Sequence, residues 1–281
     1  MPKTTKLLIN FDQLARTVAS AVVGDGLPRD SQEALARERG DRPIVVVAAA
    51  PKSGSTFLVN TLGRVLGLPN VRLCSAYSTN EHDLYLPALC LVNRNGCVSQ
   101  LHMKGTYHNA SLMRMFGIRP LVLVRRIDDI VVSLAHDFRR KAQHPAYGSG
   151  LNGYSFVWQD QCIADLGDER LLDMIIALAV PWFVNFYVSW FRLCERHAVE
   201  ALWVTYEQLL AGKRKTLDRI LAFIGDSPPV IVGDELLEQR YATFRTGGTG
   251  EGAAVLTPAQ QARLREAFAF YPDVDFGMYG L

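Results

Sequence analysis

The feature that most constrains the fold is a short buried strand that runs into a glycine-containing turn and then a helix. Residues 44–50 are all apolar, and four of these seven are β-branched. Such a run is typical of a strand covered on both faces, as in a parallel sheet. A turn follows at 51–54, and the apolar spacing of 55–66 predicts a helix that ends before Gly67 and Pro69. The core therefore begins with half of a strand–helix–strand unit.

The same alternation continues along the chain. Further strands are expected at 71–76, 97–103, 120–124 and 201–206, and helices at 80–91, 110–116, 128–141, 171–196 and 207–224. Strands that alternate with helices predict an α/β fold, with a parallel β-sheet flanked by helices in a three-layer sandwich. Because ligands of such sheets bind beyond the carboxyl ends of the strands, the functional motifs are expected there.

Domain organisation follows from length and composition. A chain of 281 residues fits one large domain or two small ones. The sequence shows no internal repeat and no low-complexity linker. We expect a partly helical lead-in at 1–42 and one domain at 43–281, with a mobile lid near 139–161, where glycine and aromatic residues are frequent.

Composition excludes several classes of protein. Hydrophobic residues make up 49% of the chain and charged residues 21%, which excludes general disorder, and a net charge of +2 argues against nucleic acid as the main partner. The cysteines are odd in number and form no C-x-x-C pair, which predicts reduced thiols in a cytoplasmic protein rather than a disulfide framework or a zinc site. They are Cys74, Cys90, Cys97, Cys162 and Cys194.

The most apolar stretch, 171–191, is either a membrane span or a buried helix. It contains Asp173, Pro181 and Asn185 and lacks the basic flanks of a transmembrane segment. These features favour a buried amphipathic helix, so no transmembrane segment is expected.

The turn at 51–54 has the composition of a phosphate-binding loop. Gly54 lets the backbone approach an anion, and the helix start offers unpaired N–H groups and the hydroxyls of Ser55 and Thr56. A Walker A loop needs lysine directly after the last glycine, where this chain has Ser55. Lys52 instead precedes the glycine, on the side from which it can neutralise the oxygen of a leaving group. The alternative is an ordinary strand–turn–helix connection.

The segment PKSGSTF at 51–57 resembles the 5′-phosphosulfate loop of the sulfotransferases that use PAPS (3′-phosphoadenosine-5′-phosphosulfate), whose usual form is P-K-[ST]-G-[ST]-[TS]-[WF]. The resemblance extends over about 43–281 and implies a P-loop-like fold. It implies a catalytic lysine that assists departure of the nucleotide, hydroxyl and N–H groups that hold the 5′-phosphate, and an aromatic ring near the adenine. The residues concerned are Lys52, Ser53, Gly54, Ser55, Thr56 and Phe57.

A second phosphate site is expected where a later strand ends at Arg125. Its guanidinium is suited to a forked contact with phosphate, and Ser133 follows eight positions later in a helix. The pair resembles the family's 3′-phosphate motif, R-[ND]-P-x-[DE]-x-x-x-S, with Asp129 at the acidic position. Arg126 and Ile127 replace Asn/Asp-Pro, which loosens the turn and adds a charge.

A histidine is the expected general base. His102 lies on the strand expected at 97–103, and the pKa of imidazole near neutrality suits proton removal. The family has a K-x-H pattern on this strand, where Gln100 here replaces the lysine. His108 is the second candidate for the base, with Lys104 in an auxiliary role. The alternative for His102 is a hydrogen-bonded structural histidine.

Two later segments resemble the family's remaining nucleotide contacts. Tyr206 lies in a Y-E-x-L segment, whose tyrosine approaches the adenine in the family. The glycine-rich segment 244–251 resembles the R-K-G-x-x-G-[DE] motif, which covers the 3′-phosphate. The alternatives are a strand-end aromatic and a plain flexible loop. The contacts implied in the loop are Phe244, Arg245, Thr246, which replaces the motif's lysine, and Gly247.

Together the motifs predict an enzyme that transfers a sulfonate group from PAPS to a hydroxyl or amine of a small molecule, sugar or lipid, and releases 3′,5′-ADP (PAP). His102 takes the acceptor proton and Lys52 stabilises the departing phosphate oxygen, so no metal is required. The basic run 139–141 either attracts an anionic acceptor or forms a solvated helix end. Two other functions stay open, a P-loop kinase that uses ATP and magnesium and a non-catalytic nucleotide-binding protein of the same fold.

Overall fold

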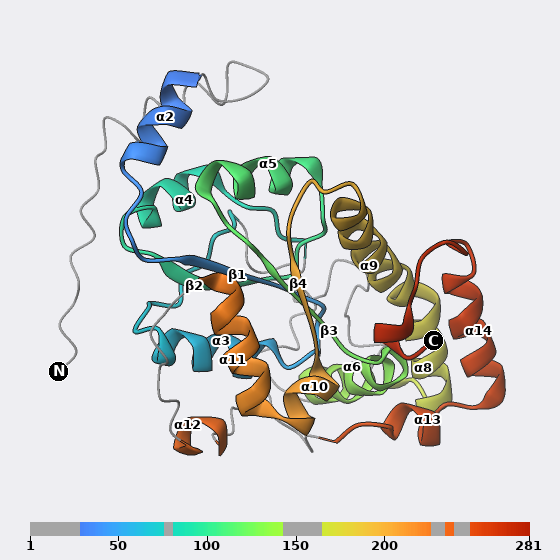
Figure 1. Cartoon of the computed structure of the whole chain (residues 1–281). Coiled ribbons are helices and arrows are strands. Elements are labelled where there is room, and N and C mark those ends of the chain that lie inside the picture. Colours follow the sequence, from blue (N-terminus) through green and yellow to red (C-terminus); the bar gives the residue numbers. More distant parts are fainter. Residues whose placement is uncertain (1–28, 76–80, 143–164, 226–233, 239–247) are drawn as a thin grey trace.

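A computed structural model of the chain describes residues 29–75, 81–142, 165–225, 234–238 and 248–281. Among these residues, four strands form one parallel sheet in the order β2-β1-β3-β4 (Figure 1). The strands are β1 (Ile44–Ala49), β2 (Cys97–Leu101), β3 (Leu121–Val124) and β4 (Leu202–Thr205). The predicted α/β fold with a parallel sheet flanked by helices is confirmed.

The side on which the chain adds successive strands to the sheet reverses at β1, although all the strands are parallel. β1 is paired with β2 on one side, where Val45 aligns with Val98, and with β3 on the other, where Ala48 aligns with Val122. The crossover from β1 thus leads to β2 on one side, and the next crossover leads back past β1 to β3. Parallel α/β sheets bind ligands at such a switch point, outside the carboxyl ends of the strands.

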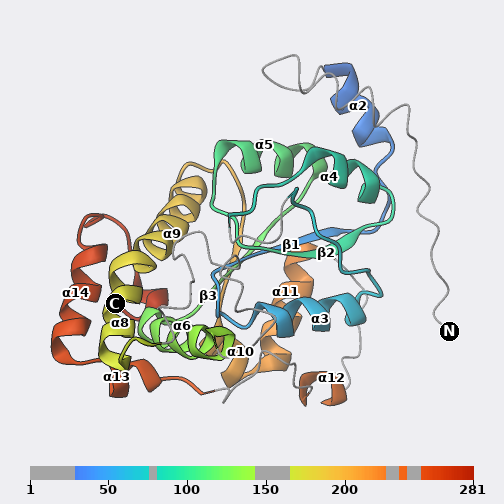
Figure 2. The same ribbon diagram turned by 180° about the vertical axis from the view of Figure 1, so that it is seen from behind.

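Alternate side chains of the strands face two separate cores, which explains why the strand sequences are apolar throughout. Val45 and Val47 face the smaller core, and Val46 and Ala48 face the larger one. The helices of the smaller core are α3 (Ser55–Val65), α10 (Tyr206–Ala211) and α11 (Lys213–Ile224), and those of the larger core are α4 (Leu86–Val92), α5 (Tyr107–Phe116), α6 (Ile127–Ala142), α8 (Asp168–Leu178), α9 (Val180–Glu195) and α14 (Pro258–Phe268). Figures 1 and 2 show α3 and α11 on one side of the sheet and α4 and α5 on the other.

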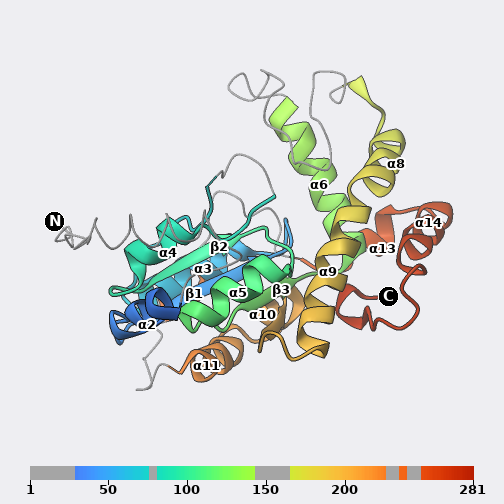
Figure 3. The same cartoon turned by 90° about the horizontal axis from the view of Figure 1, so that it is seen from above.

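The long apolar stretch is two helices rather than the single helix expected at 171–196. α8 and α9 are separated at Ala179, because Pro181 lacks a backbone N–H and suits the first turn of a new helix. Within the described residues, Asp168–Glu195 alone is long and apolar enough to cross a membrane, but 67% of its apolar window is buried inside the fold. Figure 3 shows α8 and α9 gathered with α6 and α14 at one end of the sheet. The stretch therefore gives no clear membrane span.

Three expected elements differ in extent. The strand expected at 71–76 is absent over its described part, 71–75. A single bridge, from Asn70 to Val98, lies just before it. The helix expected at 80–91 begins only at Leu86, and residues 81–85 before it are not helical. Pro87 suits the first turn of a helix and therefore favours a start at this point. The helix expected at 207–224 is interrupted at Gly212, between α10 and α11.

Other boundaries follow from capping residues. α5 begins at Tyr107 rather than near 110, because Thr106 accepts a hydrogen bond from the backbone of Asn109 and caps the helix. Tyr206 begins α10 instead of ending the strand, since Thr205 forms a capping box there. The remaining described elements are α2 (Arg29–Arg37), α12 (Asp234–Glu238), α13 (Glu251–Val255) and the 3-10 turn η1 (Gly277–Tyr279).

Candidate functional site

The first loop connects β1 to α3 at the carboxyl end of the sheet. Two of its residues have left-handed backbone conformations, Lys52 with φ 68° and Gly54 with φ 84°. For a lysine this costs on the order of 1–2 kcal/mol, a strain that is characteristic of functional sites. The buried Ser53 closes the turn, since its Oγ donates to the carbonyl of Ala50 at 2.5 Å.

Arg125, directly after β3, lies against this loop. Its guanidinium donates to the carbonyls of Lys52 at 3.3 Å and Gly248 at 3.1 Å. The side chain is only 9% exposed, and its buried Nε has no acceptor among the described residues. A buried donor without an acceptor costs about 1–3 kcal/mol, and an incoming anion oxygen removes that cost.

The ring of Tyr206 lies close to both Arg125 and Gly54 of the first loop. The Arg125 guanidinium lies 4.4 Å from the centre of its ring, a cation–π contact. A Cβ at Gly54 would come within 2.7 Å of the same ring, so the close approach of Tyr206 requires glycine. The ends of β1, β3 and β4 therefore meet at one point.

Asp129, in the first turn of α6, anchors the end of the glycine-rich segment. Its buried carboxylate accepts from the backbone N–H of Gly250 at 2.9 Å and of Gly252 at 2.8 Å, and lies 3.7 Å from Arg125. A Cβ at Gly252 would lie 2.3 Å from the carbonyl carbon of Asp128, so the docking requires glycine. Residues 248–252 are thereby held beside Arg125. The predicted contacts Phe244, Arg245, Thr246 and Gly247 lie outside the described residues, as does 143–161 of the expected lid.

The side chain of Lys52 points to α6. Its ammonium lies 3.4 Å from Oδ1 of Asp137. Oδ1 also binds Arg140 at 2.5 Å, and Oδ2 of the same carboxylate binds Lys141 at 3.1 Å. Burial lowers the pKa of Lys52, Asp137 opposes this, and Arg140 and Lys141 lower the pKa further. The charge of Lys52 therefore depends on one buried carboxylate.

His102 follows β2 and lies beside the end of β1. Its Nδ1 is 2.8 Å from the carbonyl of Ala49, which only accepts, so Nδ1 carries the proton. Nε2 is then the basic atom, and it accepts from the amide of Gln100 at 3.3 Å. Burial, and to a smaller extent the neighbouring His82 and Lys52, lowers the pKa of His102 to about 4. The ring is therefore neutral at pH 7.

His82 supports this arrangement from the loop before α4. Its Nδ1 accepts from the backbone N–H of His102 at 2.8 Å, and the two rings stack with centres 5.4 Å apart. The second candidate base, His108, is exposed at the start of α5 and its Nε2 donates to the carbonyl of Leu84 at 3.1 Å. Lys104 is paired with both oxygens of Glu81 at 2.9 Å.

The two phosphate motifs also include three predicted hydroxyl residues. Ser55 and Thr56 form the first turn of α3, where Ser55 is buried, and Ser133 lies on α6, one turn after Asp129. The additional charge expected from Arg126 is compensated, because its guanidinium donates to both carboxylate oxygens of Asp128, at 3.2 and 2.8 Å.

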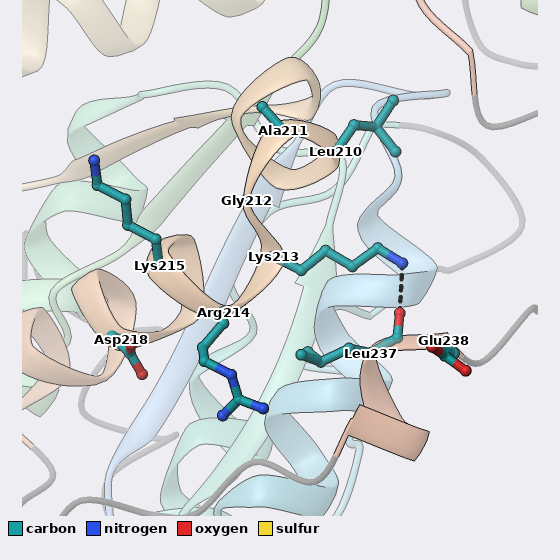
Figure 4. Close-up of a pocket in the computed structure, with 9 residues that line it drawn as sticks. All are labelled: Leu210, Ala211, Gly212, Lys213, Arg214, Lys215, Asp218, Leu237 and Glu238. Atoms are coloured by element: carbon teal, nitrogen blue, oxygen red, sulfur yellow. Dashed lines mark hydrogen bonds between the residues drawn. The ribbon is translucent and has the colours of Figure 1, made fainter.

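Phe57 lies on the side of the first loop that faces α11. The ammonium of Lys213 is 5.3 Å from the centre of its ring and donates to the carbonyl of Leu237 (Figure 4). Lys213 also lines a surface hollow of about 680 Å³ between the α10–α11 junction and α12. The hollow is basic on one side, with Arg214 and Lys215 next in sequence.

The described residues hold no cluster of metal ligands, and burial raises the pKa of each described cysteine. Within the described parts of the chain, no group of three or more histidine, cysteine or acidic side chains is placed to hold a metal ion. Cys74, Cys90, Cys97 and Cys194 are free thiols, and burial raises the pKa of Cys97 to about 12. Cys162 lies outside the described residues.

Sequence reasoning missed two residues of this site, Asp137 and His82, and part of the role of a third, Asp129. Asp137 stands in a basic run, and only its spacing of eight from Asp129 indicated that it shares the inner face of α6. Asp129 was matched to a motif, but its role in anchoring Gly250 and Gly252 needs the fold. His82 carried no sequence signal, because its contact with His102 joins residues twenty positions apart.

Comparisons with known proteins agree with the fold. No protein-family model matches the sequence, and no curated protein is significantly similar to it in sequence. Among solved structures, the chain is similar to the mouse sulfotransferase SULT7A1, whose crystal structure was determined in complex with PAP. The TM-score is 0.59 over 88% of this chain and 90% of that one, with 16% sequence identity. At that identity the similarity shows a shared fold.

Proposed function

We propose that the chain is a sulfotransferase that takes a sulfonate group from PAPS and passes it to a hydroxyl or amine of a small molecule, sugar or lipid. One observation carries the proposal. The strained Lys52 loop and Arg125 are in hydrogen-bond contact at the switch point of the sheet, and the buried Nε of Arg125 has no acceptor among the described residues. A nucleotide with two separate phosphates supplies one anion for the Lys52 loop and another for Arg125.

The residues present fit such a donor. The first loop and the start of α3 bind the 5′ end, Arg125 and Ser133 bind the 3′-phosphate, and Tyr206 and Phe57 contact the adenine. The bound nucleotide supplies the sulfonate and its leaving group. Support comes from the fold shared with a sulfotransferase crystallised with PAP. A cytoplasmic location and a site for the acceptor near 139–161 are part of the same proposal.

Lys52 and His102 carry the chemistry in this proposal. The acceptor oxygen forms a bond to sulfur while the bond from sulfur to the 5′-phosphate oxygen breaks, and the electron pair of that bond stays on the phosphate. Nε2 of His102 takes the acceptor proton, and the Lys52 ammonium stabilises the phosphate oxygen. Because nearby anions raise the pKa of a histidine, the charge of a bound donor offsets the burial that lowers the pKa of His102.

The non-catalytic alternative has two observations in its favour. The amide of Gln100 occupies the Nε2 atom that would act as the base, and the pKa of His102 is lowered to about 4. Binding of 3′,5′-ADP without transfer to any acceptor would favour this alternative.

The proposal is tested with the full chain, sulfate-labelled PAPS and a panel of phenols, sugars, sterols and amines. We expect label in at least one acceptor, unchanged by EDTA. Transfer from ATP that stops on addition of EDTA would identify a kinase instead. His102→Gln is the matched variant, since an amide at this position can still donate to Ala49 but cannot accept a proton.

A further inference from the structure

The inner face of α6 presents polar residues at three successive turns to the ends of the strands. Asp129, Ser133 and Asp137 are spaced by four, so they lie on one side of the helix. Asp129 contacts Arg125 at one end of this row, and Asp137 contacts Lys52 at the other. α6 therefore supports both cationic groups of the site with carboxylates.

Asp137 is unusual in its surroundings. It is only 3% exposed, yet it is bound by three cations, Lys52, Arg140 and Lys141. Burial removes the water that stabilises a carboxylate, so a charged carboxylate is kept inside a protein only where close cations replace that water. Arg140 and Lys141 belong to the last turn of α6 itself, whereas Lys52 comes from the loop between β1 and α3.

We propose that Asp137 is a positioning residue, whose buried carboxylate holds the ammonium of Lys52 in its charged form at the point where the leaving phosphate departs. The inference rests on the proposed function and deepens it. Sulfonate transfer needs a cation at that oxygen, and Lys52 is 17% exposed, so water contributes little to keeping it charged.

The electrostatic surroundings of Lys52 support this role. Burial lowers the pKa of Lys52, and so do Arg140 and Lys141 on α6, while Asp137 is the group that raises it. From the other elements, His102 faces Lys52 and is neutral at pH 7, and the guanidinium of Arg125 contacts the Lys52 carbonyl. Without the carboxylate, burial and the positive charges of Arg140 and Lys141 would favour the uncharged amine.

The first experiment reads the charge of Lys52 directly and needs no activity. The full chain is labelled with trinitrobenzenesulfonate across a pH series, and modification of Lys52 is quantified by mass spectrometry, because only the uncharged amine reacts. In Asp137→Asn we expect half-maximal labelling at a lower pH than in the wild type. Asp137→Glu should restore the wild-type profile. Identical profiles for wild type and Asp137→Asn would overturn the inference.

A second variant changes the profile in the opposite direction. Arg140 is 58% exposed, so Arg140→Gln should fold normally and should move labelling of Lys52 to higher pH. Asp173→Asn removes an exposed carboxylate on α8 that pairs with Arg263, and it should leave the Lys52 profile unchanged. A Lys52 profile that does not respond to Arg140→Gln would also contradict the inference.

The second experiment follows the sulfonate-transfer rate against pH. We expect kcat of Asp137→Asn to fall about ten-fold or more at alkaline pH and by much less at pH 6, since each pKa unit changes the charged fraction ten-fold. A loss of equal size at every pH would indicate a merely structural role and would contradict the inference. If the wild type transfers no sulfonate but labelling responds as described, the proposed function fails while the control of Lys52 by Asp137 stands.

Discussion

At the scale of single residues, two ionisable groups at neighbouring strand ends are held in different charge states by their partners. Lys52 is partly buried beside a carboxylate, which favours the ammonium, and His102 is partly buried beside a carbonyl, which favours the neutral Nδ1–H ring. A cation near the leaving group and a neutral base near the acceptor are what in-line sulfonate transfer requires.

Removing the cation should separate chemistry from binding. For Lys52→Ala we expect kcat to fall by about 10²–10³-fold, because a lost electrostatic contact to the departing oxygen acts mainly in the transition state. Affinity for 3′,5′-ADP, measured by calorimetry, should fall much less. Lys52→Arg retains the charge and should keep more activity than the alanine variant. Undiminished turnover in Lys52→Ala would remove the residue from this role.

The lowered pKa of His102 has a consequence for stability. The unfolded chain binds a proton at this histidine below pH 6.5 and the native protein only near pH 4, so the free energy of unfolding should rise with pH between these values. We expect this group to contribute about 2 kcal/mol to that rise. Urea unfolding of wild type and His102→Gln at pH 4.5 and 7 measures the difference. An equal pH dependence in the two proteins would argue that His102 titrates normally.

At this scale the sequence predicted the residue types that carry charge, but it could not predict their pairing. PKSGSTF and Arg125 were recognisable because a lysine, a glycine or an arginine directly after a buried strand adds little to core packing and suits anion binding. Asp137 was hidden among basic residues. Its contact with Lys52 joins two positions 85 residues apart (137 − 52) and exists only because β1 and β3 are neighbours.

At the scale of elements, the site is assembled by the start of α6. Asp129 joins this helix to residues 248–252, which brings the carbonyl of Gly248 to Arg125. Two elements were predicted nearly to their observed ends, β1 from its continuous apolar run and α3 from its helical apolar spacing. Breaks that depend on one residue, such as those at Ala179 and Gly212, were missed because an apolar helical pattern continues across them.

Substitution of two glycines in the docked segment tests this assembly. Gly252→Ala should destabilise the protein by about 1–3 kcal/mol and weaken 3′,5′-ADP binding, since its Cβ would lie 2.3 Å from Asp128. Gly250→Ala meets nothing within 4 Å and adds only the strain of φ 85°, about 1 kcal/mol. Thermal unfolding and calorimetry compare the two variants. Equal effects from both would show that the segment does not depend on close contact with α6.

At the scale of the whole molecule, a parallel sheet with helices on both faces brings segments far apart in the sequence to one edge. The order β2-β1-β3-β4 places the switch point between β1 and β3, where Lys52 and Arg125 follow their strands. A parallel sheet flanked by helices was expected from the alternation of strands and helices, but the order of its strands was not predicted. The contact of residues 248–252 with α6 was also not predicted, because turns and glycines do not reveal which helix they contact.

The central claim is that the Lys52 loop and Arg125 bind the two phosphates of one nucleotide. Calorimetry of 3′,5′-ADP, 5′-AMP and 3′-AMP with wild type, Arg125→Gln and the neighbouring control Arg126→Gln tests it most directly. The account predicts that wild type and Arg126→Gln bind 3′,5′-ADP more tightly than either monophosphate, and that Arg125→Gln binds it no more tightly than 5′-AMP. Wild-type protein that does not distinguish 3′,5′-ADP from 5′-AMP would contradict the account.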